Sequence, residues 1–124
     1  MSQRGEKARN ERGRWEFPGG SVEFGESVED ALIREVREEH NMEIEIIELL
    51  EVVSHIIPEE NQHWVSPSFI ARHKFGKADI LEPEKCSAIK WVDLSEINTE
   101  EMGGPSRRNF ETYIKLYGYK PPKI

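Results

Sequence analysis

The stretch Gly20 to Met42, GSVEFGESVEDALIREVREEHNM, constrains the fold of this 124-residue chain more than any other part. Apolar residues recur there at helical spacing, so the sequence predicts a helix over about Val28 to His40. Glu35, Glu38 and Glu39 share one face of it. At about 100° per residue, Glu35 and Glu39 continue the apolar stripe instead of opposing it. Two acids directed inward need a positive partner, and a hard divalent cation with oxygen ligands is the natural candidate.

Both ends of this helix carry recognisable signals. Ser27 is a good N-cap, and Asp30 follows three residues later as in a capping box. Asn41 tolerates the left-handed conformation in which helices often end. Arg34 follows Asp30 by four residues and precedes Glu38 by four, so it can pair with either one.

Composition limits the class of protein. The length fits one domain, residues 1–124, and three Trp and five Phe argue against disorder although 33% of residues are charged. A formal charge of −7 disfavours binding to a nucleic-acid polymer. The single cysteine, Cys86, excludes an internal disulfide and suits a reducing compartment. We find no signal peptide and no apolar run long enough for a membrane span, so we expect a soluble, cytoplasmic protein.

The rest of the chain predicts strands and a second helix. Alternating or β-branched segments predict strands over residues 15–17, 42–54, 64–74 and 87–92. A bulge is expected near Glu48 in the second strand, for which a helix is the alternative. Residues 55–63 hold a turn, 75–85 a loop and 93–97 a one-turn helix. Ser106 is expected to cap a last helix over 107–117. This order predicts an α/β fold with helices packed on a mixed sheet (α+β).

Several residues have plain structural interpretations. The basic segment 2–14 is expected to be a solvated loop or tail; the alternative is a set of phosphate contacts, led by Arg4. Trp64, Phe69 and Trp91 are expected in the core, and Cys86 as a small buried side chain.

The pattern around the first helix resembles the Nudix box. The family's motif is matched by the following residues of this chain: Gly20, Glu26, Arg34-Glu35, Val36, Glu38-Glu39, Asn41 and Met42. Asn41 stands where the family usually has Gly. The box covers residues 20–42, and the flanking Trp15-Glu16-Phe17-Pro18-Gly19 and Glu23-Phe24-Gly25-Glu26-Ser27 resemble the MutT-like branch, which acts on nucleoside triphosphates.

The resemblance implies a Nudix-type α/β/α sandwich and hydrolysis of a nucleoside diphosphate linked to another group, with Mg²⁺ or Mn²⁺. It implies that Glu35 and Glu39 are metal ligands and that Glu38 is a ligand or the base. Gly20 would give a backbone carbonyl to the metal, and Glu26 would brace the loop through Arg34.

Further site residues are predicted around the box. Glu82 and Glu84 are the candidates for an additional base or metal ligand outside the box. The alternative is that both are ordinary surface acids. Phe17 could line the substrate pocket, and Arg4 and Gly20 are the other candidates for binding substrate.

One departure concerns the beginning of the fold. The family usually has a full strand, sometimes two, ahead of residues 1–14, and we expect part of that strand to be lacking here. An exposed sheet edge invites pairing between subunits, so we hypothesise a homodimer, with strand exchange as one form of it.

Two classes of function remain open. The first is a pyrophosphohydrolase acting on a nucleoside triphosphate, an oxidised one included, with ADP-ribose or another nucleotide sugar as the alternative substrate. The second is a nucleotide-binding or regulatory module that has lost turnover.

Overall fold

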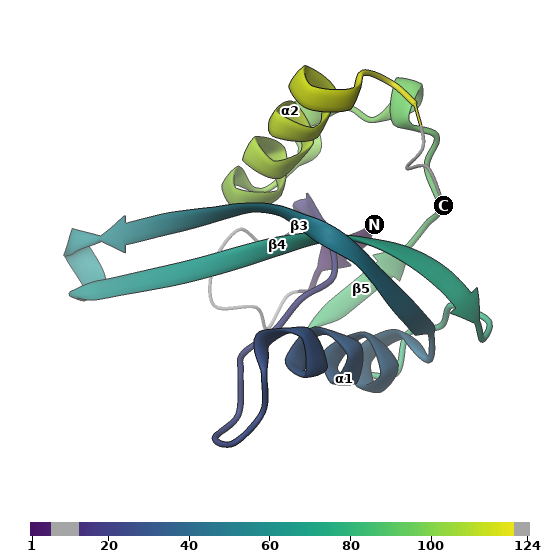
Figure 1. The fold of residues 1–124 in the computed structure, drawn as a ribbon, viewed down its shortest axis with the longest axis horizontal. Helices are drawn as coiled ribbons and strands as arrows, with labels where there is room; N and C mark the ends of the chain where they lie inside the picture. The colour runs from purple at the N-terminus through teal and green to yellow at the C-terminus, as the bar shows by residue number, and fades with distance from the viewer. Residues whose placement is uncertain (6–12, 121–124) are drawn as a thin grey trace.

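The computed structural model describes residues 1–5 and 13–120. Two helices lie on opposite sides of a layer of strands, as the α/β/α expectation requires (Figure 1). Helix α1 (Val28–His40) lies below the strands in this view, and helix α2 (Gly104–Tyr117) lies above them. The mixed α/β fold predicted from the sequence is therefore confirmed.

The strands form two separate sheets. The first has the order β2-β1-β5, from Trp15–Glu16, Ser2–Arg4 and Cys86–Ile89, and all its neighbours are antiparallel. The second is one long antiparallel hairpin of β3 (Glu43–Ile57) and β4 (Gln62–Phe75). Its turn extends beyond the two helices in Figure 1. Three short 3-10 helices, Pro58–Glu60, Leu94–Glu96 and Thr99–Glu101, complete the elements.

Helix α1 has the caps that its sequence predicts. The Ser27 hydroxyl accepts a hydrogen bond from the Asp30 backbone N–H at 3.1 Å. Asn41 ends the helix in the left-handed conformation, with φ of 57°, and its N–H donates to the Arg37 carbonyl. The bulge expected near Glu48 is present, because the β3 register shifts between Ile46 and Glu48.

Four local predictions were wrong in part. Ser2–Arg4 is a strand, because β2 and β5 both hydrogen-bond to it and tertiary pairing overrides its polar sequence. Residues 6–12 of the basic segment lie outside the described residues. The turn between β3 and β4 is shorter than 55–63, and β5 is shorter than 87–92. Helix α2 begins at Gly104, and Ser106 is not its cap. The Ser106 hydroxyl instead accepts from the Phe17 N–H at 3.0 Å.

The core lies between the helices and the strands. Its buried apolar residues are Ala31, Val36, Met42, Val53, Ile70, Cys86, Met102, Phe110 and Tyr113. Cys86 is buried as expected. Trp64 and Trp91 are not core residues, since 49% and 71% of their surfaces are exposed. Among residues 1–5 and 13–120, no helix is long and apolar enough to cross a bilayer.

Candidate active site

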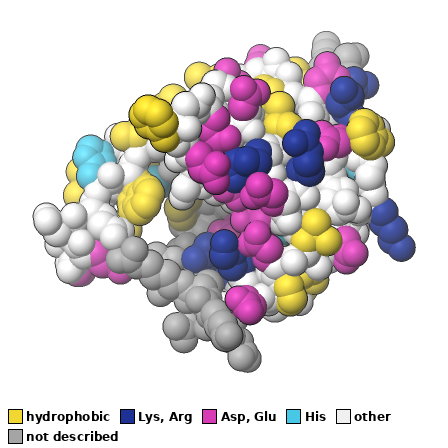
Figure 2. All heavy atoms as spheres, turned by 90° about the horizontal axis from the view of Figure 1, so that it is seen from below, with side chains coloured by type: hydrophobic (Ala, Val, Ile, Leu, Met, Phe, Trp, Pro, Cys, Tyr) yellow, Lys and Arg dark blue, Asp and Glu magenta, His cyan; other side chains and the backbone are white. Residues whose placement is uncertain are grey.

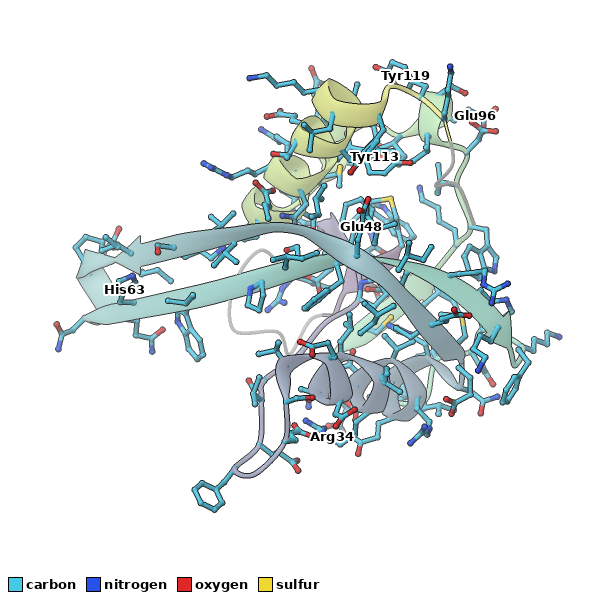
Figure 3. The ribbon with its side chains drawn as sticks, in the orientation of Figure 1. Arg34, Glu48, His63, Glu96, Tyr113 and Tyr119 are labelled. Atoms are coloured by element: carbon cyan, nitrogen blue, oxygen red, sulfur yellow. The ribbon has the colours of Figure 1, made fainter. Side chains whose placement is uncertain are left out.

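Arg34 ties the loop before α1 to the helix itself. Its guanidinium donates to Glu26 through Nε at 3.0 Å and Nη2 at 2.6 Å, and to the Ser21 carbonyl at 2.9 Å. Its Nη1 donates to Glu35 and to Glu38, each at 3.1 Å. Arg34 holds the pKa of Glu26 at about 2, well below its usual range, and Glu26 in turn raises the pKa of Arg34. The loop is thus fixed by charge-assisted hydrogen bonds, and Figure 3 shows Arg34 on α1 beside this loop.

Glu35 and Glu39 form an acidic pair on the inward side of α1. Only 15% of the Glu35 side chain and 19% of the Glu39 side chain are exposed, against 51% for Glu38. The helical angles predicted this difference. Figure 2, viewed from the α1 side, shows Asp and Glu side chains around Lys and Arg on this face.

The surroundings of the acidic pair raise the pKa of Glu39. Burial, the charge of Glu35 and a hydrogen bond with Glu35 together raise the pKa of Glu39 to about 8. Glu82 raises this pKa further, and Lys85 lowers it. A carboxyl group whose pKa is raised by burial and by a neighbouring carboxylate is suited to exchange its proton for a metal ion.

Gly20 lies against the Glu35 carboxylate from the loop side. A Cβ built on Gly20 would lie 2.2 Å from Cδ of Glu35, far inside van der Waals contact. The loop backbone therefore approaches the Glu35 carboxylate so closely that a side chain at residue 20 would have to displace that carboxylate or the loop.

These residues fit a hard divalent cation as a partial ligand set. No three His, Cys, Asp or Glu side chains are gathered as a metal cage within the described part of the chain. Mg²⁺ commonly uses one or two protein carboxylates and completes its shell with water and substrate phosphates. The Glu35–Glu39 pair beside the Gly20 backbone meets that requirement.

The substitution Gly20→Ala tests this packing. We expect the new methyl group to displace the loop or rotate Glu35, which should reduce Mg²⁺ affinity at least tenfold. Isothermal titration calorimetry measures the affinity. Gly25→Ala is less suitable as a control, because Gly25 has a φ of +90°. Gly19→Ala is the matched control, since a Cβ at Gly19 meets nothing within 4 Å. Equal affinity for both variants would contradict this account.

The two acids proposed outside the box differ in position. Glu82 is half-buried, lies 3.2 Å from the Lys85 ammonium, and is close enough to Glu39 to affect its pKa. Glu84 is exposed. The structure thus brings Glu82 towards the acidic pair, and the base or ligand roles of both acids stay predictions.

The predicted substrate contacts also lie in different places. Arg4 is held by Glu16 through a salt bridge of 3.3 Å. Phe17 lines a cavity of about 650 Å³ between α1, the β3–β4 hairpin and the segment after β5. Their substrate-binding roles, like that of Gly20, stay predictions.

The sequence analysis did not identify this cavity or His40 within it. His40 is 2% exposed and lines the cavity. It follows Val36 by four residues, so the helical spacing that placed Val36 on the apolar stripe could have placed His40 there too.

Comparison with known proteins agrees with this geometry. The family model described as NUDIX domain matches residues 1–113. The chain belongs to the Nudix hydrolase family. The fold is similar to that of a MutT Nudix hydrolase from Burkholderia pseudomallei, with a TM-score of 0.80 and 33% identity over 90% of this chain and 84% of that one.

Two curated Nudix relatives carry named activities. The chain is 36% identical to the CTP pyrophosphohydrolase of Escherichia coli, over 90% of this chain and 79% of that protein. It is 43% identical over 49 residues to the 8-oxo-dGTP diphosphatase of Proteus vulgaris, covering 40% of this chain and 44% of that protein. Against other curated relatives it spans 24% to 58% of their length.

Proposed function

We propose that this Nudix protein is a metal-dependent pyrophosphohydrolase that cleaves a nucleoside triphosphate, an oxidised one included, to the monophosphate and pyrophosphate. The observation that carries the proposal is the acidic pair Glu35–Glu39, adjoined by the Gly20 backbone and braced by Arg34. The named activities of the Escherichia coli and Proteus vulgaris relatives support a triphosphate as substrate.

Each acid has a distinct role in the proposed reaction. Glu35 and Glu39 would hold Mg²⁺ or Mn²⁺, which neutralises the anionic pyrophosphate and lowers the pKa of an attacking water. Gly20 would contribute its carbonyl. Glu38 is the first choice as base, because its side chain is half-exposed and accepts a hydrogen bond from Arg34. Glu82 is the second choice, because it alone of the two outlying acids acts on Glu39.

A non-catalytic nucleotide-binding module is the alternative class. The complete acid set in its folded arrangement favours the enzyme. Under the enzyme hypothesis, Glu38→Gln removes the base but leaves the acidic pair intact, so nucleotide binding should persist.

The substitution Glu38→Gln separates the two classes. We expect Mg²⁺-dependent turnover to fall about a hundredfold or more, as is typical for loss of a general base, while nucleotide affinity changes less than threefold. Steady-state assays with dCTP, dGTP, 8-oxo-dGTP and ADP-ribose measure turnover, and calorimetry measures binding. Preferential cleavage of ADP-ribose would show that nucleotide sugars, and not nucleoside triphosphates, are the substrate class. If the protein only binds nucleotides, neither the wild type nor the Glu38→Gln variant should form product.

A further inference from the structure

The cavity beside α1 has an unusual wall for so acidic a chain. Among the described residues, its lining includes Arg72, Lys77 and Lys90 and no Asp or Glu, although the chain carries 24 acidic and 17 basic residues. Met1 also lines it, and its ammonium group donates to the Lys90 carbonyl at 2.7 Å. An apolar cavity whose wall includes cationic residues complements a ligand with an apolar body and a negative charge.

Two buried polar groups in this wall lack hydrogen-bond partners among the described residues. Both ring nitrogens of His40, a residue with 2% exposure, lack a hydrogen bond of ordinary length there, and the carboxylate oxygen Oε2 of Glu39 lies 3.9 Å from Nε2. Nε of Arg72 also lacks a hydrogen-bond partner among the described residues, although another nitrogen of its guanidinium pairs with Glu45. Buried donors without partners are costly, and a ligand that accepts from them would remove that cost.

The remainder of the wall is apolar. Aromatic rings of Phe17, Phe69 and Trp91 line the cavity together with aliphatic side chains of α1 and β3. The Trp91 ring packs edge-on against His73, with centroids 5.6 Å apart. A nucleobase carries several polar edge atoms, and His40 offers them few partners, so this wall favours an apolar body over a base.

We propose that this cavity is a second binding site, distinct from the Glu35–Glu39 pair, that takes a small amphipathic anion. The apolar body lies between α1 and the hairpin, and the anionic head is held by Arg72 and Lys77. A volume of about 650 Å³ lies within the range of small-molecule pockets. The site does not depend on the proposed hydrolytic activity.

The probe for this site is 1-anilinonaphthalene-8-sulfonate, an aromatic anion that fluoresces when its body is desolvated. Titration of the folded wild type should show one saturable site. N-phenyl-1-naphthylamine is the neutral probe of similar shape. Near-ultraviolet circular dichroism and a single sharp thermal transition establish that each protein is folded.

Charge variants test whether Arg72 and Lys77 hold the anionic head of the ligand. Replacing both Arg72 and Lys77 by Gln should weaken binding of the anionic probe about fivefold or more. The affinity for the neutral probe should stay within twofold of wild type. The double variant Arg37→Gln, Lys74→Gln is the matched control. It removes the same charge and also breaks one ion pair, Arg37–Glu43, yet neither residue lines the cavity. An equal loss in the control, or no loss in the Arg72 and Lys77 variant, would overturn the assignment.

Filling the cavity tests its location. Ala71→Phe should weaken both probes at least tenfold, because Ala71 lines the wall. Ala78→Leu, at another lining position, serves if Ala71→Phe does not fold. Glu38→Gln should bind the anionic probe as wild type does, so loss of hydrolysis and loss of this site are separable. Full competitive displacement of the probe by dCMP without metal would show that the cavity binds the substrate instead. Unchanged probe binding in both filled variants would exclude this cavity as the probe site.

Discussion

Glu39→Gln is expected to abolish Mg²⁺-dependent hydrolysis, with kcat/KM reduced at least a thousandfold. Glu39 lies on the inward side of α1 and shares a hydrogen bond with Glu35, so its carboxylate is half of the proposed metal site. A Gln side chain keeps the shape but cannot supply the negative charge that a hard cation prefers. The assay is pyrophosphate release from dCTP or 8-oxo-dGTP with Mg²⁺ varied over the titration range.

Glu29→Gln is the matched control for this variant. Glu29 lies on the same helix, is exposed, and belongs to the first turn, away from the acidic pair. Its activity should remain within twofold of wild type. The proposed metal site would be wrong if Glu39→Gln kept wild-type turnover at saturating Mg²⁺, or if both substitutions reduced turnover equally.

The second large effect concerns pH. The pKa of Glu39 is raised to about 8, so the folded protein binds a proton between pH 4.5 and 8 that the unfolded chain releases. The stability that this proton provides is complete below about pH 4.5 and is lost as the pH rises through about 8. We therefore expect Glu39→Gln to flatten this decline in metal-free protein, as measured by urea denaturation across that range.

Mg²⁺ binding should depend on whether Glu39 is protonated. At pH 7, occupation of the acidic pair should release about one proton per cation, and affinity should rise with pH until about 8. Calorimetry in two buffers of different ionisation enthalpy measures the release. Binding without proton release in wild type would show that the cation binds elsewhere.

Local sequence signals predicted the site better than the sheet around it. The caps at Ser27 and Asn41, and the inward side of Glu35 and Glu39, depend on helical periodicity within a short stretch. They could be read from the chain because the interactions that fix them are local. The contact of Arg34 with Glu26 spans only eight residues and is present as the resemblance implied.

Long-range pairing explains what the sequence did not predict. Ser2–Arg4 becomes a strand because it pairs with β2 and, across the length of the domain, with β5. Nothing in three polar residues signals that. Ser106 similarly bonds to Phe17, which is 89 residues away in sequence. The exposure of Trp64 and Trp91 and the cavity around His40 depend on tertiary contacts, which local sequence patterns do not encode.

In the proposed function, the acidic pair on α1 supports metal-dependent cleavage of a nucleoside triphosphate between its α- and β-phosphates. The most direct measurement is identification of the products formed by wild type from dCTP, dGTP and 8-oxo-dGTP with Mg²⁺, with and without excess EDTA. We predict nucleoside monophosphate and inorganic pyrophosphate in equal amounts from at least one substrate, and none with EDTA. Release of orthophosphate in place of pyrophosphate, or product that is unaffected by EDTA, would contradict the account.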